Sequence, residues 1–552
     1  MSPGVAGLLS IGLLLVLLAL AWAPLGDHLA RVYESPRHSR VERLVYRAAG
    51  VDPDAEQGVR SYTVSVLAFS FVGIALLAAI LMGQAHLPFD RGQEGLPPLM
   101  ALNTAVSFVT NTNWQSYAGE SALGFTAQAA GLTVQNFVSA AVGMAIAVAL
   151  VRGFARVHSE SLGNFWVDLT RGLLRILLPL AVVSALLLVL CGVVQNLTDT
   201  PVQTLAGHTQ VLTGGPVASQ EAIKVLGTNG GGFFNANSAH PMENPTPASD
   251  LLQIFLILLV PVALTRTLGT MLGRRRQGLA VLAVMGVLFL GALAVTTWAE
   301  VGAHSQAAQA AGGGMEGKEV RFGPWATALF ATATTGTSTG AVNGAHDSLS
   351  PTGGGATLAT MMLGEVAPGG VGSGLYGALV MAVLAVFVAG LMVGRTPEIL
   401  GKKVGARQMT CVTLYCLTTP ALVLLGSALA LGTGDATDAM GNPGTHGFSE
   451  LLYAFTSAAN NNGSAFGGLT VTSGFFQITL GIAMLVGRFL PIVLVLLLAG
   501  SFARQGRVPE TAGTLPTHTP TFVGLLIGVI VVVTGLTYVP VLALGPIAEA
   551  LA

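Results

Sequence analysis

The chain contains 552 residues, of which 52% are hydrophobic and only 9% are charged, and its mean hydropathy is +0.69. Charged residues make up about a quarter of soluble domains, so this composition excludes a soluble globular protein. The formal net charge of −1 argues against nucleic acid as a partner, because nucleic-acid-binding domains are basic.

Apolar stretches of about 20 residues, the length that crosses a bilayer, recur along the whole chain. The first ends in Ala21-Trp22-Ala23, which is typical of a signal-peptidase site, but it lacks a basic leading segment and its apolar run is long. These two features favour a retained helix. We predict ten spans with approximate boundaries, at 5–25, 62–83, 126–150, 173–194, 250–272, 279–298, 371–393, 411–432, 475–500 and 519–545.

Arg and Lys residues gather in alternate loops, after the first, third, fifth, seventh and ninth predicted spans. The positive-inside rule places these loops in the cytoplasm. Both termini are then predicted to lie outside. The loops between spans two and three, four and five, six and seven, and eight and nine also face outward.

Four short polar segments marked by Gly or Asn lie in these outward loops. Irregular polar backbone persists at membrane depth only where protein buries it or where it lines a watery cavity. A turn between helices explains any one such segment, whereas four on the same side indicate a ring around an ion pathway. The segments are Asn111–Gln115, Thr228–Gly232, Ser338–Val342 and Asn461–Ala465.

Each polar segment follows a short, moderately apolar stretch that predicts a half-membrane pore helix. The C-terminal end of such a helix carries partial negative charge, which favours a cation. Gly tolerates the positive φ that turns carbonyl groups inward, and Asn113 is the next most tolerant residue at the same place in the first loop. No carboxylate lies in the aligned triplets, which favours a weakly hydrated monovalent ion over a hard divalent one. The predicted pore helices are 98–110, 217–227, 325–336 and 449–459.

The sequence thus predicts an all-α polytopic membrane protein with four pseudo-repeated helix–pore-loop–helix units and one extra helix at each end. The pore loops of repeats two, three and four are expected at 217–232, 325–342 and 449–465. The approximate division is 1–61 for the N-terminal helix and cytoplasmic loop, 62–150 for repeat one, 173–298 for repeat two, 299–432 for repeat three and the following helix, 433–510 for repeat four, and 511–552 for the C-terminal helix.

Two charged residues in apolar surroundings are candidates for the ion pathway. Arg488 lies inside the ninth span, where a buried cation is costly and usually functional, although a snorkelling or helix-capping role near Pro491 also fits. Glu365 lies in a glycine-rich approach to the seventh span, and it either lines a polar passage or faces the outer cavity. Residues 336–340 match the G-x-S-x-G pattern of hydrolases, but they follow a membrane segment rather than a strand.

Longer motifs carry a resemblance to a known family. The strings NTNWQSYAGE, GTNGGGFFNANSAHPMENPT, GAVNGAHDS, GGVGSGLYG, GRTPEILGKK and AANNNGSAFGG resemble the potassium-binding subunit of the bacterial Kdp-type potassium-transporting ATPase. The resemblance covers essentially the whole chain. It implies the fold of the superfamily of potassium transporters, with K⁺ as the bound ion.

On this resemblance, K⁺ is selected by triplets from the four loops, and Gln115, just past the first triplet, is linked to K⁺ entry or passage. Thr339 stands where some relatives carry Cys, and its hydroxyl keeps an oxygen available. The other candidates for the pathway or for coupling are Glu365, Ser373, Arg395, Lys402, Lys403 and Arg488. The implied filter residues are Asn111, Thr112, Asn113, Thr228, Asn229, Gly230, Ser338, Thr339, Gly340, Asn461, Asn462 and Gly463.

The sequence contains no Walker A motif, no D-K-T-G phosphorylation signature and no soluble stretch able to hold ATP. We therefore expect no catalytic site and no bound nucleotide. The resemblance implies a separate P-type catalytic subunit (KdpB), an accessory subunit (KdpC) and often a small single-span subunit (KdpF), in the bacterial cytoplasmic (inner) membrane. Selected ions would pass laterally to the catalytic subunit. The alternatives are a stand-alone channel or symporter of the Trk/Ktr type and a membrane scaffold or enzyme without transport.

Overall fold

The computed structural model describes residues 2–302, 310, 313–392, 394, 396–509 and 514–551. Within these residues, ten helical segments are long and apolar enough to cross a membrane, which confirms the predicted number. They are α1 (Pro3–Glu34), α3 (Val59–Met82), η2 with α6 (Ala127–Ala155), α7 to α8 (Phe165–Leu190), α10 (Pro247–Met271), α11 (Arg275–Val301), α15 (Ser373–Met392), α16 (Ala406–Leu431), α19 (Gly474–Ala503) and α20 (Pro520–Leu542).

Four shorter helices precede the polar loops, as predicted. The first two and the third agree with the predicted ranges to within two residues, whereas the fourth begins earlier, directly after Pro443. They are α4 (Pro98–Val109), α9 (Val217–Leu226), α13 (Gly323–Thr335) and α18 (Gly444–Asn460).

The remaining elements are short. Three two-stranded antiparallel sheets occur in the described chain, and they pair β1 with β2, β3 with β4 and β5 with β6. Their bounds are β1 (Gln57–Gly58), β2 (Ser161–Gly163), β3 (Thr200–Gln203), β4 (Thr209–Leu212), β5 (Glu398–Ile399) and β6 (Lys402–Lys403). The other helices are α2 (Arg40–Ala48), η1 (Gln84–His86), α5 (Gly119–Ala122), η3 (Gly172–Leu177, within α7 to α8), η4 (Asn237–Ala239), η5 (His346–Ser348), α14 (Pro351–Met362), α17 (Gly434–Thr437) and α21 (Pro546–Leu551).

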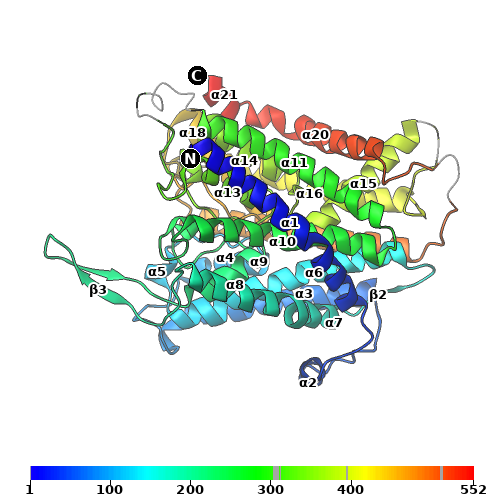
Figure 1. Ribbon diagram of the computed structural model, residues 1–552, viewed down its shortest axis with the longest axis horizontal. Coiled ribbons are helices and arrows are strands. Elements are labelled where there is room, and N and C mark those ends of the chain that lie inside the picture. Colours follow the sequence, from blue (N-terminus) through cyan, green and yellow to red (C-terminus); the bar gives the residue numbers. More distant parts are fainter. Residues whose placement is uncertain are drawn as a thin grey trace.

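Both ends of the chain lie at the same end of the helical bundle, together with the β3–β4 hairpin (Figure 1). The opposite end carries α2 and β2. This arrangement follows from the even number of spanning segments, since each one reverses the chain. Which end faces the cytoplasm remains a prediction from the charge pattern.

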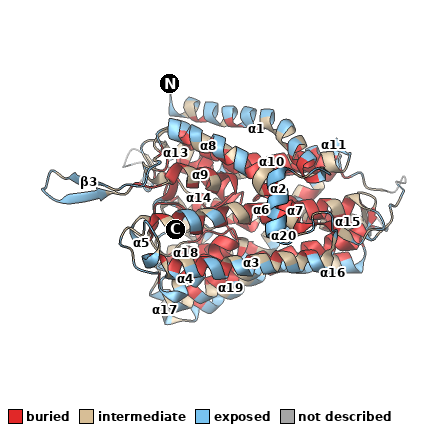
Figure 2. Cartoon of the chain, turned by 90° about the horizontal axis from the view of Figure 1, so that it is seen from below, coloured by how far each residue is buried: buried red, intermediate tan, exposed pale blue. Residues whose placement is uncertain are grey.

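Burial separates central from peripheral helices. The spanning windows of α6 and α10 are 83% buried, whereas those of α1, α16 and α20 are 17–22% buried, and exposed residues line the outer helices in Figure 2. Exposed leucines such as Leu20, Leu190, Leu425 and Leu536 suit contact with lipid tails, where apolar surface carries no hydration cost.

α1 continues beyond its predicted end at residue 25, whereas α15 agrees with the predicted seventh span, 371–393, to within two residues. α1 continues to Glu34 because its polar second half is paired with α10: Asp27 accepts both Arg266 Nε and Nη2 at 2.8 Å, and Trp22 Nε1 donates to Thr265. The seventh span is preceded by a separate helix, α14, and by a loop at 363–372, which we call the broken-helix loop. Gly364, Gly369 and Gly372 all have positive φ there, a conformation in which a right-handed helix cannot continue.

Candidate functional site

Each pore helix ends in the same way. In the Schellman motif, a left-handed residue follows the helix and the next N–H donates to a carbonyl five residues back. The second residue of every triplet makes this bond over 2.9–3.1 Å: Thr112 to Ser107, Asn229 to Lys224, Thr339 to Thr334 and Asn462 to Ser457. The first residues are the left-handed ones: Asn111 (φ 68°), Thr228 (48°), Ser338 (53°) and Asn461 (59°).

The four triplets form a closed ring. Asn111 Nδ2 of the first loop donates to the Thr228 carbonyl of the second at 2.8 Å. Asn462 Nδ2 of the fourth donates to the Thr334 carbonyl at the end of the third pore helix at 3.0 Å. Asn461 Nδ2 donates to Thr112 Oγ1 at 2.9 Å, which joins the fourth loop to the first. The C-terminal, partially negative ends of all four pore helices therefore meet at one ring.

The third residue of each triplet packs on a neighbouring loop. A Cβ added to Gly463 would lie 1.9 Å from the Thr112 carbonyl oxygen, and one on Gly340 would lie 2.3 Å from that of Asn462. A Cβ on Gly230 would lie 2.2 Å from the Thr339 carbonyl oxygen. Real carbon and oxygen atoms do not approach so closely, so glycine is required at these three places.

Asn113 holds the corresponding place in the first loop. Its φ is 62°, against 85° at Gly340 and 100° at Gly463, which confirms that Asn adopts the left-handed conformation there. Its amide Nδ2 donates to Asn136 Oδ1 on α6 at 2.6 Å. Room for its Cβ comes from the second loop, because Gly231 has no side chain where the two loops meet.

The side chains of the second triplet residues make hydrogen bonds within the protein. Thr112 Oγ1 pairs with Thr110 Oγ1 at 2.9 Å, and Thr339 Oγ1 pairs with Thr337 Oγ1 at 2.6 Å. Asn229 Nδ2 donates to the Asn136 carbonyl at 2.9 Å. Because Thr337 Oγ1 donates to the Ala333 carbonyl at 2.6 Å, the Thr339 hydroxyl is the donor to Thr337, and its oxygen keeps acceptor lone pairs.

A small cavity of about 70 Å³ borders the ring. It brings together three residues that the sequence singled out separately, Glu365, Ser373 and Arg488, with Ser338 and Asn461 of the triplets. Glu365 also contacts the ring directly, since Asn462 Nδ2 donates to its Oε1 at 3.0 Å. Glu365 therefore lies between the ring and this cavity.

Arg488 lies on α19 and is 5% exposed. In the part of the chain that the structure describes, its guanidinium has no hydrogen-bond or ion-pair partner, and its Nη2 faces α6, 3.4 Å from where a Cβ of Gly143 would be. Snorkelling to the membrane surface is therefore not its role. A buried unpaired cation beside the ring is costly.

The broken-helix loop supports the ring from the cavity side. The Val371 N–H donates to Thr228 Oγ1 at 2.9 Å, and the Gly369 N–H donates to the Gly336 carbonyl at 2.7 Å. With the contact between Glu365 and Asn462, this segment touches three of the four loops. Sequence reasoning found its composition but not this role.

Within the described chain, the other residues predicted to serve in the pathway or in coupling do not line the small cavity beside the ring. Lys402 is completely buried, and its Nζ donates to the carbonyls of Arg156 and Gln505 at 2.6 and 2.9 Å. Lys403 is exposed, and Arg395 lies outside the described residues. Gln115 is half-buried just beyond the first triplet.

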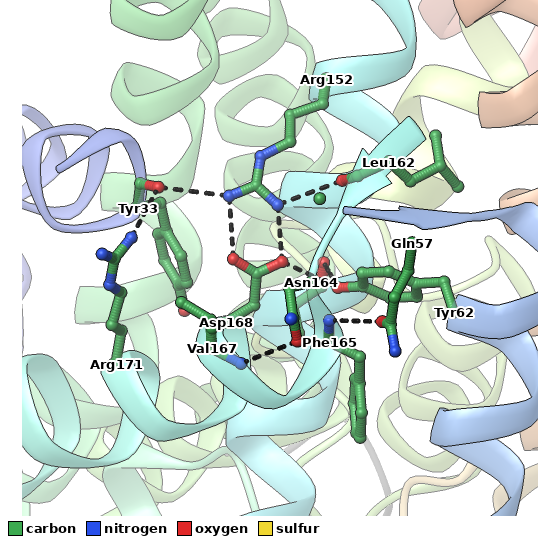
Figure 3. Close-up of polar contacts among 12 residues, drawn as sticks. Tyr33, Gln57, Tyr62, Arg152, Leu162, Asn164, Phe165, Val167, Asp168 and Arg171 are labelled. Carbon is green, nitrogen blue, oxygen red and sulfur yellow. Dashed lines mark hydrogen bonds and ion pairs between the residues drawn. The ribbon is translucent and has the colours of Figure 1, made fainter. Parts of the chain in front are cut away.

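A second polar cluster lies near β2, at the end of the molecule opposite the termini (Figure 3). Arg152 of α6 makes two bonds to the Asp168 carboxylate of α7, at 2.6 and 2.8 Å. Asp168 also accepts the Tyr62 hydroxyl of α3, and Arg152 donates to the Tyr33 carbonyl of α1. The adjoining cavity, of about 540 Å³, shares no lining residue with the triplets. This cluster ties four helices together.

Sequence reasoning missed the polar residues that support the triplets from α6. Ser139 Oγ donates to Asn111 Oδ1 at 2.6 Å and lies 3.3 Å from Asn229 Oδ1, while Asn136 contacts both Asn113 and Asn229. A signal was present, because buried amides and hydroxyls in the middle of a predicted span need partners.

Comparison with known proteins gives consistent matches. The sequence model of one family, described as potassium-transporting ATPase A subunit, matches residues 12–551. A relative from Kineococcus radiotolerans, named potassium-transporting ATPase potassium-binding subunit, is 62% identical over 547 residues, covering 99% of this chain and 98% of its own. A Streptomyces coelicolor protein of the same name is 59% identical over 553 residues, and both chains are covered completely.

Among solved structures, the fold is similar to that of the potassium transporter TrkH from Vibrio parahaemolyticus. The TM-score is 0.54 at 15% sequence identity, over 81% of this chain and 86% of TrkH. At this identity the likeness concerns the fold alone.

Proposed function

The chain belongs to the family of potassium-transporting ATPase A subunits, and from this membership we propose that it binds and selects K⁺ for an ATP-driven uptake complex. The relatives carry the name of a potassium-binding subunit. The site for the ion in this proposal is the ring formed by the four triplets.

The observation that carries the proposal is the closed ring of four Schellman-capped loops. Rings of backbone carbonyls replace the hydration shell of a weakly hydrated cation. The side chains of Thr112, Asn229 and Thr339 are hydrogen-bonded to other protein groups, and no carboxylate lies in a triplet. The chemistry of the ring therefore fits K⁺ better than a divalent ion, which prefers carboxylate ligands.

The same proposal covers the route after binding. Arg488, buried and unpaired beside the small cavity, would repel K⁺ moving straight through the subunit. Ions would then pass laterally, by way of the passage lined by Glu365 and Ser373, to a P-type catalytic subunit. The proposal also includes the predicted division into four repeats and the predicted location of both termini on the outer face of the bacterial inner membrane.

Catalysis is assigned to a partner. We propose that this chain holds no catalytic site or nucleotide and that a P-type subunit, with an accessory and a small single-span subunit, supplies ATP hydrolysis. A stand-alone transporter is the main alternative, and the likeness to TrkH in fold does not favour it, since family membership points to an ATPase complex. K⁺-stimulated ATPase activity that requires co-expression with the P-type partner would separate the two.

The direct test is K⁺ binding by isothermal titration calorimetry on the purified complex. Gly463→Ala places a methyl group against the Thr112 carbonyl, and we expect K⁺ affinity to fall by about tenfold or more, equal to about 1.4 kcal/mol. Gly528→Ala on α20 is the matched control, because a Cβ there meets nothing within 4 Å. Unchanged K⁺ affinity in Gly463→Ala would exclude the ring as the binding site.

A further inference from the structure

The second loop departs from the fourfold pattern at its third residue. Asn113, Gly340 and Gly463 all have left-handed backbone, with φ of 62°, 85° and 100°, whereas Gly230 has no positive φ. The first residue of this loop, Thr228, follows the common pattern at φ 48°. The departure is therefore confined to the end of the triplet.

Asn237 provides the contact that accompanies this departure. Its Nδ2 donates to the Gly230 carbonyl at 2.6 Å, and Gly232 packs so closely that an added Cβ would lie 2.7 Å from the same nitrogen. Asn237 is 8% exposed, and its own φ is 54°. The Gly230 carbonyl is therefore bonded to the protein.

Lys224 fixes which end of the Asn237 amide faces Gly230. Its Nζ donates to Asn237 Oδ1 at 2.9 Å, and the Ser238 N–H donates to the same oxygen at 3.0 Å. An ammonium group has donors and no acceptor. If the amide turned over, its NH₂ group would face the ammonium and its oxygen would face the Gly230 carbonyl, so only the observed orientation is stable.

Two glutamates hold Lys224 in place. Its Nζ lies 2.5 Å from Glu243 Oε1 and 2.6 Å from Glu221 Oε2. Lys224, Glu221 and Glu243 are at most 2% exposed. A buried charge must be paired to be tolerated, so this triad leaves the ammonium no alternative position.

The position of Lys224 in the pore helix matters too. It is the Schellman acceptor of the second loop, equivalent to Ser457 in the fourth. There the Ser457 hydroxyl accepts the Gly463 N–H at 2.9 Å. The same helix position therefore contacts the third triplet residue directly in loop four and through Asn237 in loop two.

Resting on the proposed filter function, we propose that Lys224 and Asn237 are positioning residues that hold the Gly230 carbonyl out of the fourfold pattern and thereby set the ion preference at this end of the ring. A carbonyl bonded to Asn237 is not free to turn towards an ion. Without the bond, the Gly230 peptide gains the freedom that glycine allows, and the ring loses a fixed geometry that distinguishes K⁺ from Rb⁺ and Na⁺.

The decisive variant is Asn237→Asp. It keeps an acceptor for Lys224 and replaces the N–H donor to Gly230 with a carboxylate oxygen, and it also adds a negative charge beside Glu221 and Glu243, whose effect on folding the melting temperature records. Lys224→Met removes the group that orients Asn237. Lys318→Met is the matched control, because Lys318 is also a buried lysine, paired with Glu300 at 2.8 Å, and has no contact with the triplets.

The measurement is competition of Rb⁺ and Na⁺ with K⁺ by calorimetry, on the full chain in its native membrane complex, with melting temperature recorded in parallel. We expect Asn237→Asp and Lys224→Met each to reduce discrimination against Rb⁺ or Na⁺ by about tenfold. The double variant should lose no more than either single one, since both act on one contact. Lys318→Met should keep wild-type discrimination whatever its stability.

If a folded Asn237→Asp complex discriminates against Rb⁺ and Na⁺ as the wild type does, the inference is wrong. This result is decisive even if Lys224→Met does not fold. If Lys318→Met loses as much discrimination against Rb⁺ and Na⁺ as Lys224→Met, the inference is also wrong, because removing any buried lysine would then have the same effect. If instead the wild-type complex bound no K⁺, or Gly463→Ala left K⁺ affinity unchanged, the proposed function itself would fail.

Discussion

Asn111 Nδ2 donates to the carbonyl of Thr228 at 2.8 Å, although the two residues are 117 positions apart in the sequence. The bond joins the first polar loop to the second, and Ser139 on α6 holds the other end of the same amide. One side chain therefore sets the spacing of two loops.

We predict that Asn111→Gly weakens K⁺ binding by about tenfold, or about 1.4 kcal/mol. Glycine keeps the left-handed backbone at this position, so only the cross-loop bond and the bond to Ser139 are lost. Calorimetric titration with K⁺ measures the effect. Wild-type affinity in this variant would show that the side chain of Asn111 has no part in shaping the ring.

Gly230→Asp should weaken K⁺ binding and admit Rb⁺ or Na⁺. A Cβ at this position would lie 2.2 Å from the Thr339 carbonyl oxygen, and the carboxylate adds a charge to a ring of neutral oxygens. Ion competition in the purified complex is the measurement, with Gly528→Ala as the control. If the order of ion preference stays the same, Gly230 is not part of the filter.

Arg488→Gln is expected to lower coupled transport and to permit K⁺ leak, whereas Arg488→Lys should retain part of the function. Moving a unit charge against 100 mV costs about 2.3 kcal/mol, and a buried cation beside the pathway adds a local barrier of the same sign. Flux of K⁺ into proteoliposomes, with and without ATP, tests this. Normal coupling and no leak in the Gln variant would leave Arg488 as a structural residue.

Lys402 and Lys403 should behave differently on charge reversal. Lys403→Glu changes an exposed residue, and we expect it to reduce K⁺-coupled ATPase activity with no change in K⁺ binding. Lys402→Glu places a carboxylate against the carbonyls of Arg156 and Gln505, so it should destabilise the loop itself and lower the melting temperature. Full ATPase coupling in Lys403→Glu would mean that β5–β6 does not contact the catalytic partner through this side chain.

The docking of α21 should depend on pH through His446, which lies outside the spanning helices. Hydrogen bonds to Asp347 and Glu549 raise the pKa of His446 to about 9, and Glu450 of the same helix also faces it. Because the folded-state pKa exceeds the ordinary value of about 6.5, this stabilisation is complete below about pH 6.5 and is lost as pH rises through 9.

Hydrogen exchange in 546–551 measures this docking. Exchange protection should fall between pH 7 and pH 9.5, once corrected for the intrinsic pH dependence of exchange. In His446→Gln the corrected protection should be low and independent of pH. An equal fall in protection in that variant would show that another group controls the docking of the C-terminal helix.

The sequence was sufficient for the spans, the pore helices and the position of the loops, because hydropathy and glycine content are local properties. It was also sufficient to single out Glu365 and Arg488, since charged residues in apolar surroundings are conspicuous. That these two border one cavity with Ser338 and Asn461 depends on how distant segments pack, and no local pattern contains that information.

Two features needed the structure for a different reason. Lys402 and Lys403 are adjacent and chemically identical, and both contact Gln505. The Lys402 ammonium is buried against the carbonyls of Arg156 and Gln505, whereas Lys403 is exposed. The triplets were aligned on their third residues because glycine is conspicuous there, whereas the feature common to all four loops is the left-handed first residue, which is Asn, Thr or Ser. Composition does not reveal a left-handed backbone at Thr228 or Ser338, because Thr and Ser seldom adopt it.

Thr228 is the least suited of these residues to its conformation, since a β-branched side chain at positive φ is strained, and the Val371 N–H of the broken-helix loop supports its hydroxyl. The Thr228 hydroxyl therefore joins the second loop to the broken-helix loop. A displacement of 363–372 removes a bond that Thr228 needs, and an ion that stabilises the ring stabilises that bond. If K⁺ binds in the ring as proposed, reciprocity requires that ion occupancy change the free energy of moving the broken-helix loop by the same amount that the loop's position changes ion affinity.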